Sequence, residues 1–131
     1  MSVVVDSSVL VDLLTGAAQP SLLGDAFEQE WHAPAHLDAE VVHALRGLVL
    51  GAHISAARAQ DALTDLHELR LRRWPLELPL ARRCLELAHN VSAYDAAFLT
   101  LAEVLDCPML TRDARLARAA DGLSGAQVQV V

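Results

Sequence analysis

The sequence predicts a single α/β domain spanning residues 1–131, with a mainly parallel central sheet flanked by helices on both sides. Two observations lead to this prediction. Short apolar segments, the first an uninterrupted β-branched run at residues 3–5, are typical of strands buried on both faces of a sheet. Segments with helical spacing of apolar residues alternate with them, which is the order of an α/β fold. At 131 residues, the chain is long enough to bury one sizeable core.

Capping residues and prolines set the expected limits of these elements. Ser7 and Ser8 are candidate N-caps of the first helix, Gly16 is its expected stop, and Pro20 is suited to opening the second helix. Helices are predicted at residues 7–15, 20–29, 36–50, 55–69, 79–89, 92–105 and 113–120. Strands are predicted at residues 3–5, 31–33, 73–76, 108–111 and 128–131.

The charge of the chain argues against a general affinity for nucleic acid. Seventeen acids stand against ten bases, a net charge of −7, whereas contacts to phosphates normally dominate such binding. Every base is an arginine, however, and six arginines lie in two short stretches. The stretch at residues 70–73 is typical of a solvated face, whereas Arg112, Arg115 and Arg118 flank Asp113. Arg112 and Arg115 are therefore candidate contacts to nucleic-acid phosphates.

The composition also bears on partners and location. An apolar fraction of 53% is high for a chain of this size, so we expect self-association or a bound partner to cover apolar surface. The five aromatic residues do not predict a stacking platform for unpaired bases. The two cysteines are expected in the core rather than in a disulfide. With no basic leader and no apolar run approaching about 18 residues, we expect a cytoplasmic protein without membrane contact.

Four acidic residues stand where a strand should end or a helix should begin: Asp6, Glu40, Asp95 and Asp113. Asp6 and Asp113 follow predicted strands, and ligands of open α/β sheets bind beyond the carboxyl ends of the strands. If the fold brings the four together, the chain has no lysine to neutralise them. Such a set of carboxylates is suited to a divalent cation, and carboxylates with a bound cation are suited to phosphodiester hydrolysis.

Each of these acids also has a purely structural explanation. Asp6 and Asp113 can cap the helices that follow them. Asp95 lies three residues after Ser92, the spacing of a capping box with Asp in place of Glu. Glu40 can be an ordinary residue at the margin of an apolar helix face. The competing hypothesis is therefore a non-catalytic protein-binding module, in which the acids are caps and the apolar surface recruits a partner.

Other chemistries have weaker support. Glu40-x-x-His43 and Glu86-x-x-His89 repeat the unit of di-iron carboxylate bundles, but the strand signals contradict a four-helix bundle. A Gly-Lys phosphate-binding loop needs a lysine, and the chain lacks the Gly-x-Gly-x-x-Gly and Gly-x-Ser-x-Gly motifs. The remaining histidines have no convincing partner spacing and are expected at the surface: His32, His36, His53 and His67.

The order and spacing of the acidic motifs resemble those of PIN-domain proteins, specifically the VapC toxins of bacterial toxin–antitoxin pairs. The resemblance covers nearly the whole chain, through VVVDSSVLVDLL, APAHLDAEVVHALRGLV and SAYDAAFLTLAEVLDCPMLTRDARLARAA. It implies that the four acidic positions of the family are Asp6, Glu40, Asp95 and Asp113. The hydroxyls that support the site in that family match Ser7 and Thr111.

The resemblance implies an endoribonuclease that depends on Mg²⁺ or Mn²⁺. One or two such cations would relieve the repulsion among the carboxylates, with Asp6 and Asp95 as the most direct ligands. Glu40 and Asp113 would bind them directly or through water. The resemblance further implies an RNA substrate, a homodimer, and inhibition by a cognate VapB-like antitoxin that covers the active site. A PIN nuclease that serves RNA maturation or DNA processing is the alternative within the same family.

Overall fold

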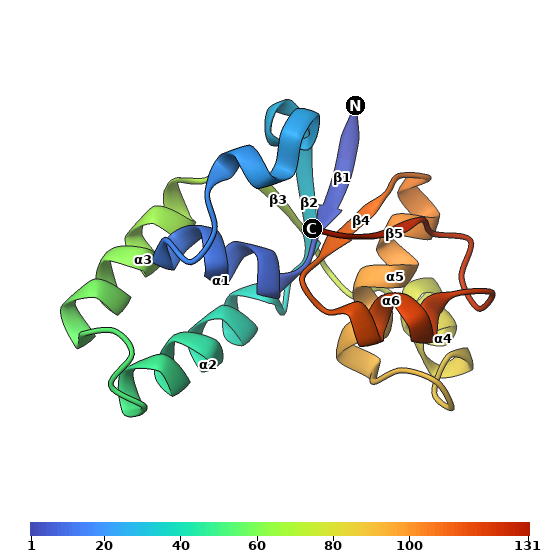
Figure 1. Ribbon diagram of the computed structural model, residues 1–131. Helices are drawn as coiled ribbons and strands as arrows, with labels where there is room; N and C mark the ends of the chain where they lie inside the picture. The colour runs from blue at the N-terminus through green and yellow to red at the C-terminus, as the bar shows by residue number, and fades with distance from the viewer.

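The computed structural model describes residues 1–131 and contains one five-stranded sheet in which all neighbouring strands are parallel (Figure 1). The strands are β1 (Ser2–Val5), β2 (Glu30–Pro34), β3 (Leu71–Trp74), β4 (Met109–Thr111) and β5 (Val128–Val130). Their order is β3-β2-β1-β4-β5, so two strands are added on one side of β1 before the chain crosses to the other side. This reversal creates a topological switch point between β1 and β4, and such points bind ligands beyond the carboxyl ends of the strands.

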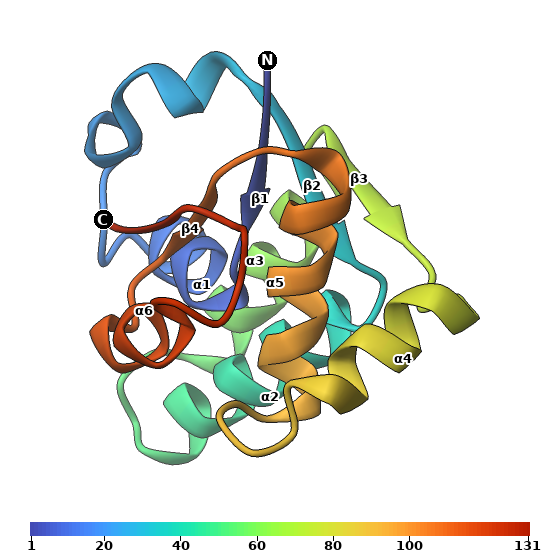
Figure 2. The ribbon, with the colours of Figure 1, turned by 90° about the vertical axis from the view of Figure 1, so that its right-hand side faces the viewer.

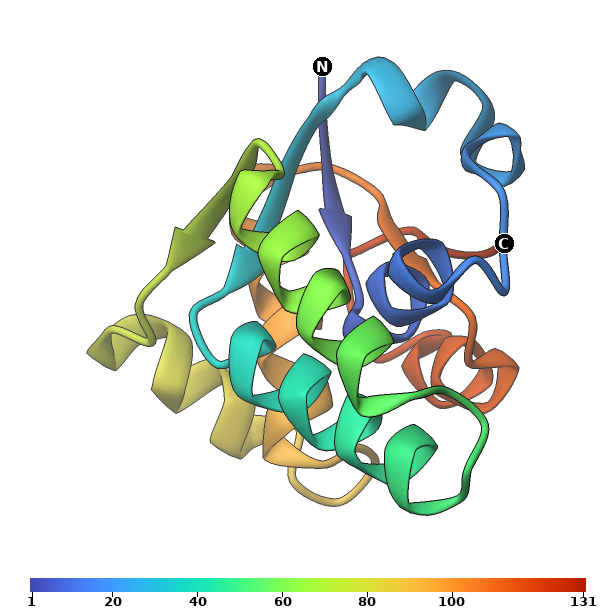
Figure 3. The same cartoon turned by 90° about the vertical axis from the view of Figure 1, so that its left-hand side faces the viewer.

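Helices cover both faces of this sheet. On one face lie α1 (Ser7–Thr15), α2 (Leu37–Leu50) and α3 (Ala56–Glu68), which Figure 3 shows in front. On the other face lie α4 (Leu78–Glu86), α5 (Ala93–Leu105) and α6 (Ala114–Ala120), which Figure 2 shows in front. A 3-10 segment, η1 (Pro20–Glu28), connects α1 to β2. The prediction of an α/β domain with a parallel sheet and helices on both sides is confirmed.

The core forms where β1 and α5 meet. Val3, Val4 and Val5 are at most 1% exposed, because β1 is the middle strand of the sheet. In α5, residues 96–102 are buried without a break, because this helix packs on β1, β2 and β4 and is covered by α4. The packing fixes the first turn of α5, which carries Asp95.

Several predicted boundaries differ from the structure. β3 begins and ends two residues earlier than predicted, because Pro75 has no N–H to continue the strand ladder. The helix predicted at residues 20–29 is the 3-10 segment η1, broken at Gly24, where φ is 53° and ψ is −132°. The helix predicted at residues 79–89 ends at Glu86. None of the helices combines the length and the apolar character that a membrane span requires.

The predicted surface position of His32 is wrong. His32 lies in β2 and is 3% exposed, and the indole N–H of Trp74 in β3 donates to its Nδ1 at 2.9 Å. Its other ring nitrogen, Nε2, is buried without a hydrogen-bond partner, 3.7 Å from a carboxylate oxygen of Glu30. Burial lowers the pKa of His32. The side chain is therefore part of the packing between the sheet and its helices.

Replacing Trp74 tests this packing. Trp74→Phe keeps an aromatic ring but leaves His32 Nδ1 buried without its donor, so we expect unfolding free energy to fall by about 1–3 kcal/mol in urea denaturation. In a His32→Phe background, which has no acceptor, the same Trp74→Phe change should cost clearly less. Equal costs in both backgrounds would contradict this role for the hydrogen bond.

Candidate active site

Asp6 lies directly after β1, at the switch point of the sheet, and is 6% exposed. It occupies the N-cap position of α1, but its side chain makes no capping hydrogen bond. Instead, the hydroxyls of Thr111 and Ser8 donate to its Oδ2 at 2.7 and 2.8 Å, and the Ser7 hydroxyl lies 3.4 Å from Oδ1. The carboxylate of Asp6 is therefore held by these hydroxyl groups and not by capping of α1.

Burial is the largest influence on Asp6 and raises the pKa of its carboxyl group. The hydrogen bonds from Thr111 and Ser8 act in the opposite direction, and repulsion from Glu40 raises the pKa further. Because no arginine is among the groups that shift this pKa, the negative charge of Asp6 is oriented by hydroxyls rather than neutralised.

Asp95 lies in the first turn of α5, and its backbone N–H donates to the Ser92 hydroxyl at 3.1 Å. The pKa of Asp95 is also raised, first by burial, then by repulsion from Asp6 and Glu40, and more weakly by Asp113. A hydrogen bond with the Ser92 side chain opposes this. The fold thus brings the four predicted acids close enough to repel one another, although they come from four different elements or connections.

Glu40 lies in the first turn of α2, four residues after His36. The His36 Nε2 and Glu40 Oε1 atoms are 3.3 Å apart, yet neither has a hydrogen-bond partner of good geometry, and both are buried. The His36 ring packs against Tyr94 and Phe98. We predicted a surface position for His36; the structure instead places it beside the acids. The i, i+4 spacing of His36 and Glu40 is the sequence signal that marks this contact.

Asp113 combines the capping role with a place beside the other acids. Its Oδ1 accepts from the backbone N–H groups of Arg115 and Leu116 at 2.9 and 3.4 Å, which caps α6 and leaves Oδ2 outside the cap. Its own backbone N–H donates to Thr111 Oγ1 at 3.0 Å. The Thr111 hydroxyl therefore connects Asp113 to Asp6. The second donor to Asp6 is Ser8, which the sequence did not identify as a site residue.

The two candidate arginines have different surroundings. Arg112 donates from Nε to Asp12 at 2.8 Å and from a terminal nitrogen to the Val131 carbonyl at 2.7 Å, so its charge is already paired. The side chain of Arg115 is 88% exposed, and its closest acidic contact is to Asp113 at 3.9 Å. Arg115 is thus the freer of the two for an external phosphate.

The donor chemistry of the acids fits a hard divalent cation. All four supply carboxylate oxygens, the ligands that Mg²⁺ and Mn²⁺ prefer, and Glu40 Oε1 is buried without a hydrogen-bond partner. As the side chains lie, no three of the potential ligands form a ready-made coordination shell. The residues therefore suit a cation by charge and atom type, and their side chains would have to converge to enclose it.

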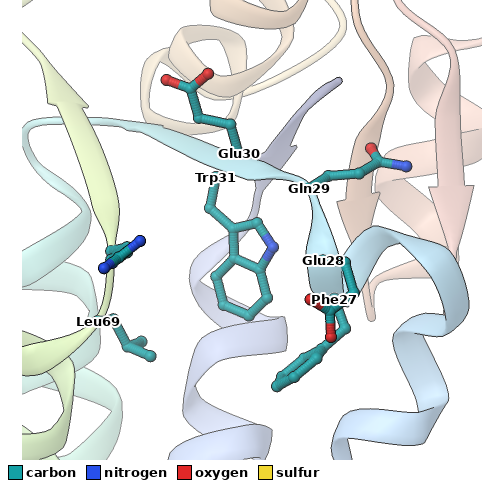
Figure 4. A pocket seen from close by; sticks show the side chains of 7 residues that line it. Phe27, Glu28, Gln29, Glu30, Trp31 and Leu69 are labelled. Carbon is teal, nitrogen blue, oxygen red and sulfur yellow. The ribbon is translucent and has the colours of Figure 1, made fainter.

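Three pockets have similar volumes; one, of about 490 Å³, lies between α6 and β5, and the other two lie at opposite ends of the sheet. One, of about 520 Å³, lies beside the acids and includes Ser7, Glu40 and Tyr94. The other, of about 470 Å³, is formed where η1 leads into the start of β2, with Phe27 and Trp31 in its wall (Figure 4). It contains none of the predicted site residues. Because ligands of open α/β sheets bind beyond the carboxyl ends of the strands, the pocket beside Glu40 is the better candidate for the active site.

Comparison with known proteins agrees with this geometry. Residues 3–122 match the PIN domain. The chain is 44% identical to ribonuclease VapC1 of Mycobacterium tuberculosis over 122 residues, 92% of this chain and 91% of that protein. It is 36% identical to ribonuclease VapC12 of the same organism, over 88% and 90% of the two chains. The crystal structure of VapBC2 from Rickettsia felis, bound to a DNA fragment from its promoter, has the same fold, with a TM-score of 0.68 at 12% identity and coverage of 99% and 98%. The chain belongs to the PIN-domain family, among the VapC proteins.

Proposed function

We propose that this protein is a metal-dependent endoribonuclease and the toxin of a VapBC-type toxin–antitoxin pair. The observation that carries the proposal is the mutual repulsion of Asp6, Glu40 and Asp95 at the switch point of the sheet, with no arginine among the groups that shift the pKa of Asp6 or Asp95. A buried carboxylate with a raised pKa weakens the fold, because desolvation disfavours its charged form. Helix capping alone does not account for this cost, since the Asp6 side chain caps nothing.

The relatives support the substrate class and the partner. Both similar mycobacterial proteins are named ribonucleases, and the Rickettsia felis structure is of a VapBC2 pair. By extension, we propose RNA as the substrate, a VapB-like antitoxin as the partner, a homodimer as the working form, and a cytoplasmic location. A nuclease of RNA maturation would share the site but not the antitoxin, so co-purification of a small antitoxin encoded next to this chain separates the two roles.

The residues of the chain have separable tasks in hydrolysis. Thr111 and Ser8 hold Oδ2 of Asp6, which leaves Oδ1 with only the longer contact to Ser7 and available to a ligand. Asp95 supplies a second carboxylate, whose raised pKa shows that its charge is poorly compensated. The unpartnered Oε1 of Glu40 is suited to accept a proton from the attacking water. The capping bonds to Oδ1 of Asp113 fix that carboxylate, with Oδ2 outside the cap.

Mg²⁺ or Mn²⁺ would be held by Asp6 and Asp95, with Glu40 and Asp113 binding directly or through water; when bound, it offsets the carboxylate charge, polarises the phosphate and lowers the pKa of a water molecule. In the reaction, the water oxygen bonds to phosphorus and the bond between phosphorus and the 3′ oxygen breaks. That oxygen takes up a proton, so the products carry a 5′-phosphate and a 3′-hydroxyl.

Removing one carboxylate tests the catalytic proposal. Asp6→Asn keeps an oxygen that can accept from Thr111 but removes the charge, so RNA cleavage measured by gel should be abolished while the far-UV spectrum stays unchanged. Asp95→Asn should have the same effect, and EDTA should abolish cleavage by the unchanged chain until Mg²⁺ or Mn²⁺ is added back. Full activity in EDTA, or in a folded Asp6→Asn protein, would refute the metal site.

The raised pKa values of Asp6 and Asp95 predict how the stability of the metal-free protein depends on pH. A carboxyl group whose pKa is higher in the folded state adds stability below its ordinary pKa of 3.8, and this contribution is lost as the pH rises through the folded-state value. In EDTA, the melting temperature of Asp6→Asn should therefore rise relative to that of the unchanged chain as the pH increases from about 4 to about 8.

Asp61→Asn is the matched control, because Asp61 is an exposed acid on α3, away from the four acids. It removes the same formal charge, and its melting curve should run parallel to that of the unchanged chain across this pH range. Parallel curves for Asp6→Asn as well would show that burial and repulsion do not weaken the fold at Asp6.

Salt dependence of RNA binding distinguishes the arginines. Arg115→Ala should weaken binding and reduce the slope of log K against log salt by about 1, as the loss of one phosphate contact requires. Arg112→Ala should change the slope less, because Arg112 is paired with Asp12. Arg82→Ala, an exposed arginine of α4, serves as control. Equal slopes for the Arg115→Ala and Arg82→Ala variants would indicate that Arg115 is a solvated surface residue without a contact to phosphate.

A further inference from the structure

Tyr94 is a large aromatic side chain left open to solvent beside the acids. It directly precedes Asp95 in α5 and is 65% exposed. Its ring lies 5.6 Å from that of His36 at an interplanar angle of 60°, and His36 is itself packed edge-on against buried Phe98 at 5.3 Å. One side of the Tyr94 ring therefore packs against His36, and the other side is exposed to solvent. The five aromatic residues in the sequence did not predict a stacking platform for bases, but the structure leaves one aromatic ring exposed at this position.

The pocket that Tyr94 lines has one of the four acids, Glu40, in its wall. Ser7 and Glu40, which contribute to the pocket wall, also belong to the group of residues around Asp6. Ala39 and Ala44 line the pocket from α2, and their small side chains leave the space open. At about 520 Å³, its volume falls within the range of small-ligand sites.

The chemistry of the lining favours a neutral, flat group with polar edges. No lysine or arginine lines the pocket, and Glu40 makes its wall acidic, so an anionic group is disfavoured there. Ser7 and His43 offer hydrogen-bonding groups around the aromatic ring. An unpaired nucleobase combines a face for stacking with edges that donate and accept hydrogen bonds.

We propose that this pocket binds an unpaired base of the nucleotide that adjoins the scissile phosphate, with Tyr94 as its stacking surface. The inference rests on the proposed ribonuclease function and adds how the substrate is positioned: the phosphate goes to the acids and their cation, and the attached base goes to the pocket. A base within a duplex is stacked and paired, so the pocket selects single-stranded segments of RNA.

The first test combines changes in the protein and in the substrate. Stacking on one aromatic side chain predicts that Tyr94→Ala lowers kcat/KM for a single-stranded oligonucleotide by about 5- to 150-fold, while Tyr94→Phe stays within about twofold. An abasic nucleotide on one side of the scissile phosphate should cause a similar loss with the unchanged chain. That abasic substrate should then be cleaved equally by Tyr94→Ala and the unchanged chain.

Two further variants control for damage to the fold. Phe27→Ala removes another exposed aromatic ring, from the pocket at the far end of the sheet (Figure 4), and should leave kcat/KM unchanged. Ala39→Leu fills the proposed pocket from an exposed helix position, where leucine is also a good helix former. It should reduce cleavage of the intact oligonucleotide but not of the abasic one. Equal effects on both substrates, from Tyr94→Ala and from Ala39→Leu, would overturn the proposal.

The second test needs no cleavage. Tyr94 is the single tyrosine of the chain, so labelling with 3-fluorotyrosine yields one ¹⁹F resonance. In Mg²⁺, adenosine or uridine 5′-monophosphate should shift this resonance in a saturable manner, whereas ribose 5-phosphate should not. No shift with either nucleotide, or an equal shift with ribose 5-phosphate, would overturn the base pocket even if cleavage depends on Asp6. Conversely, a nucleotide-specific shift without metal-dependent cleavage would support the pocket while refuting the proposed function.

Discussion

The structure depends on one costly placement, a buried carboxylate at the end of the middle strand. Asp6 follows three fully buried valines, so the strand that builds the core also delivers a charge into a site with little water. Hydroxyls from α1 and β4 orient this carboxylate but do not neutralise it. Parallel strands then direct the neighbouring connections to the same edge of the sheet, which brings Glu40, Asp95 and Asp113 into range. The fold thus concentrates negative charge where a cation can offset it.

Much of this arrangement could be predicted because its signals are local in sequence. The β-branched run of β1 and the serine before α5 fix two elements without reference to the rest of the chain. Once the strands are taken as parallel, acids that follow them must lie near one edge of the sheet, which explains why Asp6 and Asp113 could be chosen as candidates. Their ability to act as caps was equally predictable, and the structure shows capping for Asp113 but not for Asp6.

The rest could not be predicted because it depends on contacts between distant segments. Ser8, rather than Ser7, is the closer donor to Asp6 because of how the first turn of α1 meets β4, a geometry that two adjacent serines do not reveal. His32 has no polar neighbour in sequence that indicates burial, and its partner Trp74 is 42 residues away. The open face of Tyr94 likewise results from the packing of α5 against His36 of the α2 N-terminus. Binding surfaces of this kind emerge from tertiary packing rather than from motifs.

Binding of a divalent cation is the central claim, and calorimetric titration of the metal-free protein with Mn²⁺ at neutral pH tests it most directly. We expect saturable binding to the unchanged chain, loss of that binding in a folded Asp6→Asn variant, and unchanged binding in Asp61→Asn, because Asp6 takes part in the repulsion that the cation relieves and Asp61 does not. Absence of binding, or equal affinity in the Asp6→Asn protein, would refute a divalent-cation site at Asp6.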